Sequence, residues 1–215
     1  MTRPAARAAL ALAACALLAL IGTGTAREPS GRFLAISDVH LDPFTGGDVD
    51  ARLIGTDAEG WQALYGDDLG PPADYGSDAN VALLEAALAD AARRVPNPDF
   101  VVYPGDFVVH RLERKTKAVD AGATDATVGA MAERITRFLA GRLRAAFPDA
   151  PILPALGNTD SACGDYRIEP GGPYLAATFG TLKALVGEDL LAADAQATWT
   201  AGGYYAAAHP TLAAT

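Results

Sequence analysis

Three short apolar runs follow the N-terminal region of the chain, each bounded by proline, glycine or charged residues. They cover residues 32–37, 99–103 and 151–156. Apolar runs of this length, the second rich in β-branched and aromatic side chains, are typical of buried strands. A run of glycine, tyrosine and alanine over residues 202–208 predicts a further strand.

Apolar residues at helical spacing fill much of the chain between these runs. A first stripe follows Ser77 and Asp78, either of which can cap a helix, and Pro96 ends it. A second stripe predicts an amphipathic helix over residues 125–147, and residues 175–186 predict another helix. The apolar positions of the first two stripes are Val81, Leu84, Leu88, Ala92, Val128, Met131, Ile135, Phe138, Leu139 and Leu143.

Two polar segments have few apolar residues at helical spacing. Residues 42–78, rich in glycine, aspartate and proline, predict a long loop, and residues 111–124 predict a loop or a frayed turn. The remaining order is strand, helix, strand, helix, strand, which predicts an α/β domain with a mainly parallel sheet. No internal repeat or low-complexity linker divides the chain, so we expect one domain.

The first 26 residues have the three-part pattern of a secretory signal peptide. Arg3 and Arg7 precede the uncharged apolar run Ala8–Ile21, and Gly24–Ala26 places small residues at a cleavage site. A membrane-spanning helix needs about 20 apolar residues, more than this run provides. The pattern therefore predicts a signal peptide over residues 1–26 and a secreted or periplasmic location.

A lipid anchor is the alternative for this segment. Leu12–Cys15 resembles a bacterial lipobox, which would attach a lipid to Cys15, but the residues after Cys15 stay strongly apolar, as in a signal peptide. Cleavage after residue 26 leaves residues 27–215, for which we expect no transmembrane helix. Cys163 is then the single cysteine, which excludes a disulfide scaffold.

Composition narrows the class of function. The 215 residues are 50% hydrophobic and 20% charged, which is typical of a globular domain and not of a disordered chain. The formal net charge is −9, and a general nucleic-acid binder needs a basic face to neutralise phosphates. We therefore expect no nucleic-acid-binding surface.

Metal-binding residue types follow each of the three predicted strands. Asp38 and His40, two residues apart, follow the first strand, and glycine-preceded Asp106 follows the second. Asn158, also preceded by glycine, follows the third, with Asp160 close behind. Ligands of open α/β sheets bind outside the carboxyl ends of the strands. Asp-x-His alone occurs by chance, and Gly-Asp and Gly-Asn are ordinary turn dipeptides. The functional interpretation therefore depends on the three motifs occurring in succession.

Together these motifs resemble the calcineurin-like metallophosphoesterase family, whose pattern is Asp-x-His, Gly-Asp and Gly-Asn. Residues 33–42, 104–110 and 156–160 resemble its acid sphingomyelinase-like branch, which includes the endopolyphosphatases. The resemblance covers residues 32–209. It implies an α/β/β/α sandwich and hydrolysis of a phosphoester, most specifically a phosphodiester, by a hydroxide that two metal ions activate.

The resemblance also implies a role for each matched residue. Asp38 and His40 would bind the first metal, Asp106 would bridge both metals, and Asn158 would bind the second. Zinc suits such ligands best, and iron or manganese also suit them. His110 matches the histidine of the branch's Gly-Asp-x-x-x-His motif, which implies either proton donation to the leaving alcohol or contact with the phosphoryl oxygens. The alternative for His110 is a surface histidine in a loop.

The sequence departs from the family pattern in two places. Thr159 stands where most members carry a histidine, and Asp160 next to it could serve as the acid with a raised pKa. His209 is the only histidine after Asn158, and the later Gly-His-x-His motif is absent. We therefore expect an N-terminal portion of the domain, incomplete at its C-terminus. Two alternatives stay open for Cys163: a free thiol, or a disulfide with a cysteine in the missing part.

Three functions remain open at this point. The first is an exported metal-dependent phosphoesterase. The second is a catalytically dead, truncated remnant or pseudoenzyme of the same family, which the missing histidines motivate. The third is an exported binding protein that uses an α/β scaffold without a metal, because a fold alone does not fix a function.

Overall fold

A small parallel sheet organises residues 31–209, the part of the chain that the computed structural model describes. The predicted signal peptide and Cys15 lie outside these residues. The strands are β1 (Phe33–Ala35), β2 (Phe100–Tyr103) and β3 (Ile152–Pro154). The helices are α2 (Val49–Ile54), α3 (Ala58–Tyr65), α4 (Val81–Arg94), α5 (Leu112–Val119), α6 (Asp125–Ala146), α7 (Pro173–Val186) and α8 (Ala195–Gly202), with a 3₁₀ turn, η1, at Glu188–Leu190.

The sheet has the strand order β1-β2-β3, and both strand pairs are parallel. Phe33 pairs with Phe100 across the first interface, and Val101 pairs with Ile152 across the second. Parallel neighbours require crossover connections, and here α4 lies in the first crossover and α6 in the second. The structure confirms the predicted α/β class with a parallel sheet flanked by helices.

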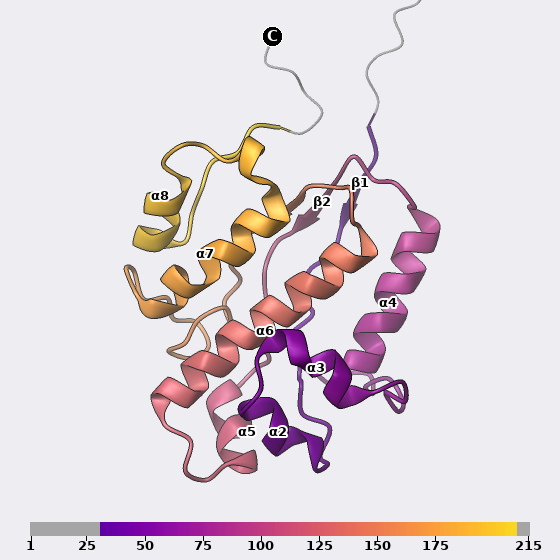
Figure 1. The fold of residues 1–215 in the computed structure, drawn as a ribbon, viewed down its shortest axis with the longest axis vertical. Helices are drawn as coiled ribbons and strands as arrows, with labels where there is room; N and C mark the ends of the chain where they lie inside the picture. Colours follow the sequence, from indigo (N-terminus) through magenta and orange to yellow (C-terminus); the bar gives the residue numbers. More distant parts are fainter. Residues whose placement is uncertain (1–30, 210–215) are drawn as a thin grey trace, which may run out of the picture. The chain divides into compact units, whose positions relative to one another are not determined.

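Helix α6 is the centre of the helical layer. It packs against α3, α4, α5 and α7, and Figure 1 shows it as the long helix between α4 and α7. Its apolar stripe is buried as the period predicts, with Ile135, Leu139 and Leu143 fully buried. Thr124 caps its first turn by accepting a hydrogen bond from the Thr127 backbone N–H. The strong pattern and the cap explain why this helix was predictable from sequence.

The short helices are where the sequence prediction was wrong. Residues 42–78 contain α2 and α3, where a long loop was expected, and residues 111–124 contain α5, where a loop or a frayed turn was expected. Trp61 of α3 is fully buried, contacts the ring of Phe138, and donates its indole N–H to the carbonyl oxygen of Leu53. Helices this short are marginal alone, so tertiary contacts such as these stabilise them.

Two further predictions were also wrong. The cap of α4 is Asn80, whose side chain accepts a hydrogen bond from the Leu83 backbone N–H, and not Ser77 or Asp78. Residues 202–208 form no strand, because Ala207 makes only an isolated antiparallel bridge to Leu191. Within residues 31–209, no helix combines the length and the apolar character that crossing a bilayer requires.

Candidate metal centre

The loops that follow β1 and β2 stay hydrogen-bonded to each other beyond the sheet. The backbone N–H of Asp38 donates to the carbonyl oxygen of Gly105 at 3.2 Å, and that of His40 donates to the carbonyl oxygen of Asp106 at 2.9 Å. Leu41 continues the series by donating to Phe107 at 2.9 Å. This pairing fixes the register of the two loops and brings their polar side chains together.

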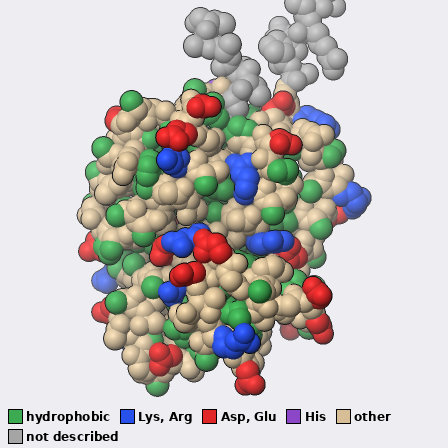
Figure 2. Space-filling view, in the orientation of Figure 1, with side chains coloured by type: hydrophobic (Ala, Val, Ile, Leu, Met, Phe, Trp, Pro, Cys, Tyr) green, Lys and Arg blue, Asp and Glu red, His purple; other side chains and the backbone are tan. Residues whose placement is uncertain are grey.

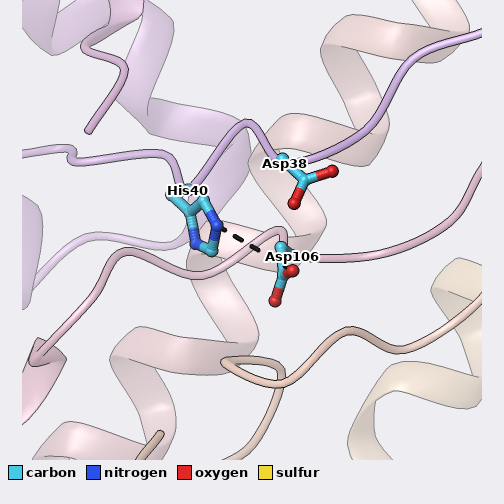
Figure 3. A group of neighbouring side chains, drawn as sticks. All are labelled: Asp38, His40 and Asp106. Carbon is cyan, nitrogen blue, oxygen red and sulfur yellow. Dashed lines mark ion pairs between the residues drawn. The ribbon is translucent and has the colours of Figure 1, made fainter. Parts of the chain in front are cut away.

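Asp38, His40 and Asp106 form a compact group that could hold a metal ion. One ligand atom from each residue lies within 4.8 Å of the other two. His40 Nε2 lies 3.8 Å from Asp106 Oδ2, the pair joined by the dashed line in Figure 3. Asp106 is 8% exposed, His40 is partly buried and Asp38 is exposed, so the group opens to solvent on one side. Two carboxylates and one imidazole are suitable ligands for a divalent transition metal.

The ring of His40 is oriented for metal binding. Its Nδ1 lies 3.3 Å from the carbonyl oxygen of Val108, which can only accept a hydrogen bond. In a neutral ring this contact requires the tautomer with the proton on Nδ1, and the lone pair of Nε2 is then on the side of Asp106. Metal-binding histidines are commonly held in this way, with the second ring nitrogen bonded to a carbonyl or carboxylate oxygen. The donor set therefore fits a cation.

The backbone is strained at all three residues of the group. Five non-glycine residues in the described part of the chain have positive φ angles, and three of them are Asp38 (57°), His40 (45°) and Asp106 (63°). The left-handed region costs free energy for residues with a Cβ atom, and such strain concentrates at functional sites. This concentration supports a functional role independently of the residue types.

Thr159 holds Asp106 in position. Its backbone N–H and its hydroxyl group each lie 3.0 Å from Asp106 Oδ1, which leaves Oδ2 directed toward His40. The same hydroxyl lies 2.7 Å from the carbonyl oxygen of Val108. The sequence showed Thr159 only as a departure from the histidine of the family pattern. The structure shows a buried side chain that orients a candidate ligand.

Two glycines allow the loops after β2 and β3 to approach backbone to backbone. Gly105 has a φ of 114°, and a Cβ atom there would lie 2.6 Å from the carbonyl carbon of Leu156. A Cβ atom on Gly157 would collide with the backbone nitrogen and the carboxylate of Asp106. The glycines of the Gly-Asp and Gly-Asn motifs are therefore required by the close approach of these loops.

Asn158 and Asp160 lie on the third loop with different surroundings. Asn158 is exposed, and its backbone carbonyl oxygen accepts a hydrogen bond from the Tyr166 N–H at 2.6 Å. The role of its side-chain amide as a metal ligand stays a prediction. Asp160 is 2% exposed, and its carboxylate accepts hydrogen bonds from four backbone N–H groups. Burial raises the pKa of the Asp160 carboxyl, and those N–H groups oppose the rise. Its predicted catalytic role remains a prediction, and the structure does not include it in the metal-binding group.

His110 lies directly beside the group. Its ring stacks on the ring of His40 with centroids 3.9 Å apart, and its Nδ1 lies 2.7 Å from Asp78 Oδ1. Lys115 Nζ lies 3.6 Å from the other oxygen of Asp78 and also pairs with Asp42. Sequence reasoning assigned Asp78 to a solvated loop or a cap. Its contact with His110 depends on the path of the chain before α4, which the local pattern does not indicate.

Comparisons with known proteins match the part of the chain that contains this group. A family model described as calcineurin-like phosphoesterase matches residues 31–204, which include every residue of the group. The chain is 33% identical over 144 residues to the human acid sphingomyelinase-like phosphodiesterase 3b, covering 67% of this chain and 29% of that protein. It is 31% identical over 146 residues to the endopolyphosphatase of Saccharomyces cerevisiae, covering 65% of this chain and 21% of that protein.

A third relative, sphingomyelin phosphodiesterase A of Dictyostelium discoideum, is 28% identical over 179 residues, covering 81% of this chain and 27% of that protein. The matched region is thus less than a third of the length of each of these three relatives. The small parallel sheet with its flanking helices is consistent with part of the fold of such proteins.

Proposed function

The chain belongs to the calcineurin-like phosphoesterase family, and on that premise we propose that it is an exported, metal-dependent enzyme that hydrolyses phosphodiesters. The family is metal-dependent and acts on phosphoesters. The observation that carries the proposal is the group formed by Asp38, His40 and Asp106, with its strained backbone and its oriented imidazole. Export is the part of the proposal that depends on the N-terminal sequence pattern, outside the described residues.

Each residue of the site would have its own role in hydrolysis. Asp38, His40 and Asp106 would hold one divalent ion, and Asp106 with Asn158 would contribute to a second, zinc being the first candidate and iron or manganese the others. A divalent cation supplies positive charge to phosphoryl oxygens and lowers the pKa of a water ligand. Thr159 fixes one carboxylate oxygen of Asp106, so the other stays available to a cation.

His110 would exchange a proton with the leaving group in this proposal. Asp78 lies at hydrogen-bonding distance from Nδ1 of His110 and so fixes the orientation of the ring. Nε2 is then the nitrogen left to give a proton to the departing alkoxide. The stacking of the His110 ring on the His40 ring supports this role, because the two ring centroids lie only 3.9 Å apart.

The attraction for an anionic substrate must be local. The chain carries a formal net charge of −9, and Figure 2 shows acidic and basic side chains interspersed on one face without a continuous basic patch. Long-range steering of a phosphoester is therefore not expected. Bound cations would provide the positive charge at the site itself. The names of the relatives support a phosphodiester as the first substrate to test and polyphosphate as the second.

Hydrolysis of bis(p-nitrophenyl) phosphate tests the proposal. We expect the purified protein to release p-nitrophenol after loading with Zn²⁺ or Mn²⁺, to lose this activity in EDTA, and to regain it when the metal is restored. Asp38→Asn should lose the activity, and Asp67→Asn, a change in an exposed loop, should keep it. Assays with p-nitrophenyl phosphate and with inorganic polyphosphate would show whether monoesters or anhydrides are preferred.

Two other results would contradict the proposal, and each favours a different alternative. A folded protein that binds the metal without hydrolysing any of the three substrates would contradict the proposed activity and favour the catalytically dead alternative. A folded protein that neither binds metal nor changes its thermal transition with EDTA would favour a metal-free binding protein.

A further inference from the structure

We propose that Asp160 is a positioning residue, whose carboxylate ties the loop after β2 to the loop after β3 and thereby sets the metal-binding geometry of Asp106 and His40. The inference rests on the proposed metal-binding function. It assigns Asp160 a role other than that of the acid, which the sequence suggested because Thr159 stands in place of the family histidine.

The hydrogen bonds of Asp160 define a clamp between the two loops. Its Oδ1 accepts from the backbone N–H groups of Phe107 at 2.7 Å and Val108 at 3.1 Å. Its Oδ2 accepts from the backbone N–H groups of Asp106 and Gly157, both at 2.8 Å. Three consecutive N–H groups of one loop therefore converge on a single carboxylate, the arrangement in which a backbone forms an anion-binding concavity.

The backbone conformation of Asp106 makes this convergence possible. Asp106 has a φ of 63°, and the left-handed residue turns the following N–H groups toward the same point. A strained conformation persists only where surrounding contacts over-determine it. Asp160 provides such contacts, because it accepts hydrogen bonds from the backbone N–H of Asp106 itself and from those of the two residues that follow.

Burial makes the clamp specific for a carboxylate. Asp160 is 2% exposed, and no lysine, arginine or histidine in the described part of the chain forms an ion pair with it. A buried charge without an ionic partner is tolerated only where hydrogen bonds replace its hydration. An asparagine of the same shape would direct an NH₂ group at N–H donors, so two or more of the four bonds would be lost.

The clamp reaches two candidate ligands. Asp160 accepts a hydrogen bond from the backbone N–H of Asp106, while Thr159 donates hydrogen bonds to the side chain of Asp106. It also accepts a hydrogen bond from the N–H of Val108, and the carbonyl oxygen of Val108 in turn lies at hydrogen-bonding distance from His40 Nδ1. Both oxygens of Asp160 are thereby engaged with backbone donors. Loss of the clamp should therefore weaken metal binding by more than a general loss of stability would.

A matched pair of variants of the full-length protein tests this inference. Asp50 is also buried, at 5% exposure, and its carboxylate accepts from the N–H groups of Thr45 and Gly46, each at 2.8 Å, neither of which belongs to the metal-binding group. We expect Asp160→Asn and Asp50→Asn both to lower the urea midpoint in EDTA. At 25 °C, equilibrium dialysis with Co²⁺ should show about 10–100-fold weaker binding to Asp160→Asn and less than threefold change for Asp50→Asn. The visible spectrum of bound Co²⁺ should change only in Asp160→Asn.

The outcomes separate this inference from the proposed function. If the unmodified protein binds no Co²⁺, the proposed function is wrong. If it binds Co²⁺ and Asp160→Asn binds with the same affinity and spectrum, the positioning role is overturned. Should Asp160→Asn fail to fold, Asp160→Glu decides, because it retains an acid but lengthens the clamp. We expect at least tenfold weaker Co²⁺ binding for Asp160→Glu, and unchanged binding would contradict the proposal.

Discussion

Asp106→Asn is expected to lower the rate of metal-dependent phosphodiester hydrolysis by about 10³-fold or more, a loss of roughly 4 kcal/mol of transition-state stabilisation. Asp106 lies at the centre of the site, with one carboxylate oxygen held by Thr159 and the other 3.8 Å from His40 Nε2. The amide keeps the shape of the side chain and can still accept from Thr159. Its NH₂ group then occupies the place of the second oxygen and cannot bind a cation.

Two measurements check this expectation. The first is kcat/KM for bis(p-nitrophenyl) phosphate at saturating Zn²⁺ or Mn²⁺, and the second is the metal content after dialysis. Asp67→Asn serves as the control, because it removes the same charge from an exposed loop. Hydrolysis by Asp106→Asn at the unmodified rate would show that the reaction does not use this carboxylate.

Gly105→Ala is expected to lower the free energy of unfolding by roughly 4 kcal/mol, a value in the range reserved for strained backbone and severe overpacking. Gly105 has a φ of 114°, and an added Cβ atom would lie 2.6 Å from the carbonyl carbon of Leu156. Rotation of a side chain cannot relieve this contact, because the atoms opposite the Cβ belong to the backbone. The loops after β2 and β3 would have to separate, and metal binding should be lost with them.

Gly141→Ala is the matched control for this variant. Gly141 lies in α6, and an added Cβ atom there meets nothing within 4 Å. Alanine is favoured over glycine in a helix by about 1 kcal/mol, so this variant should be at least as stable as the unmodified protein. Urea unfolding in EDTA measures both. Equal stability of the two variants would contradict the close approach of the loops.

The sequence predicted the parts of the fold that depend on local pattern. The strands β1, β2 and β3 lie within the predicted apolar runs, and α4, α6 and α7 follow their stripes. The helices α2, α3 and α5 escaped prediction because contacts far along the chain stabilise them, such as the packing of Trp61 on Phe138. A short helix of this kind leaves little period to detect.

The candidate site likewise contains residues that the sequence pattern indicated and residues whose roles depend on tertiary contacts. Asp38, His40 and Asp106 could be found because the carboxyl ends of parallel strands converge, so residue type and position were enough. Thr159 and Asp160 could not be assigned their positions from sequence. Their contacts are with groups about fifty residues away along the chain, as in the bonds from Thr159 to Asp106 Oδ1 and from the Phe107 N–H to Asp160. The pairing of Asp78 with His110 depends likewise on tertiary structure.

Anomalous X-ray diffraction from crystals grown with Zn²⁺ tests the central claim most directly. The claim is that Asp38, His40 and Asp106 together bind a divalent cation. We expect an anomalous peak at about 2.0–2.2 Å from His40 Nε2 and from a carboxylate oxygen of Asp38 and of Asp106. Well-ordered loops with no peak between these three residues, at a Zn²⁺ concentration that fills other sites, would contradict the claim.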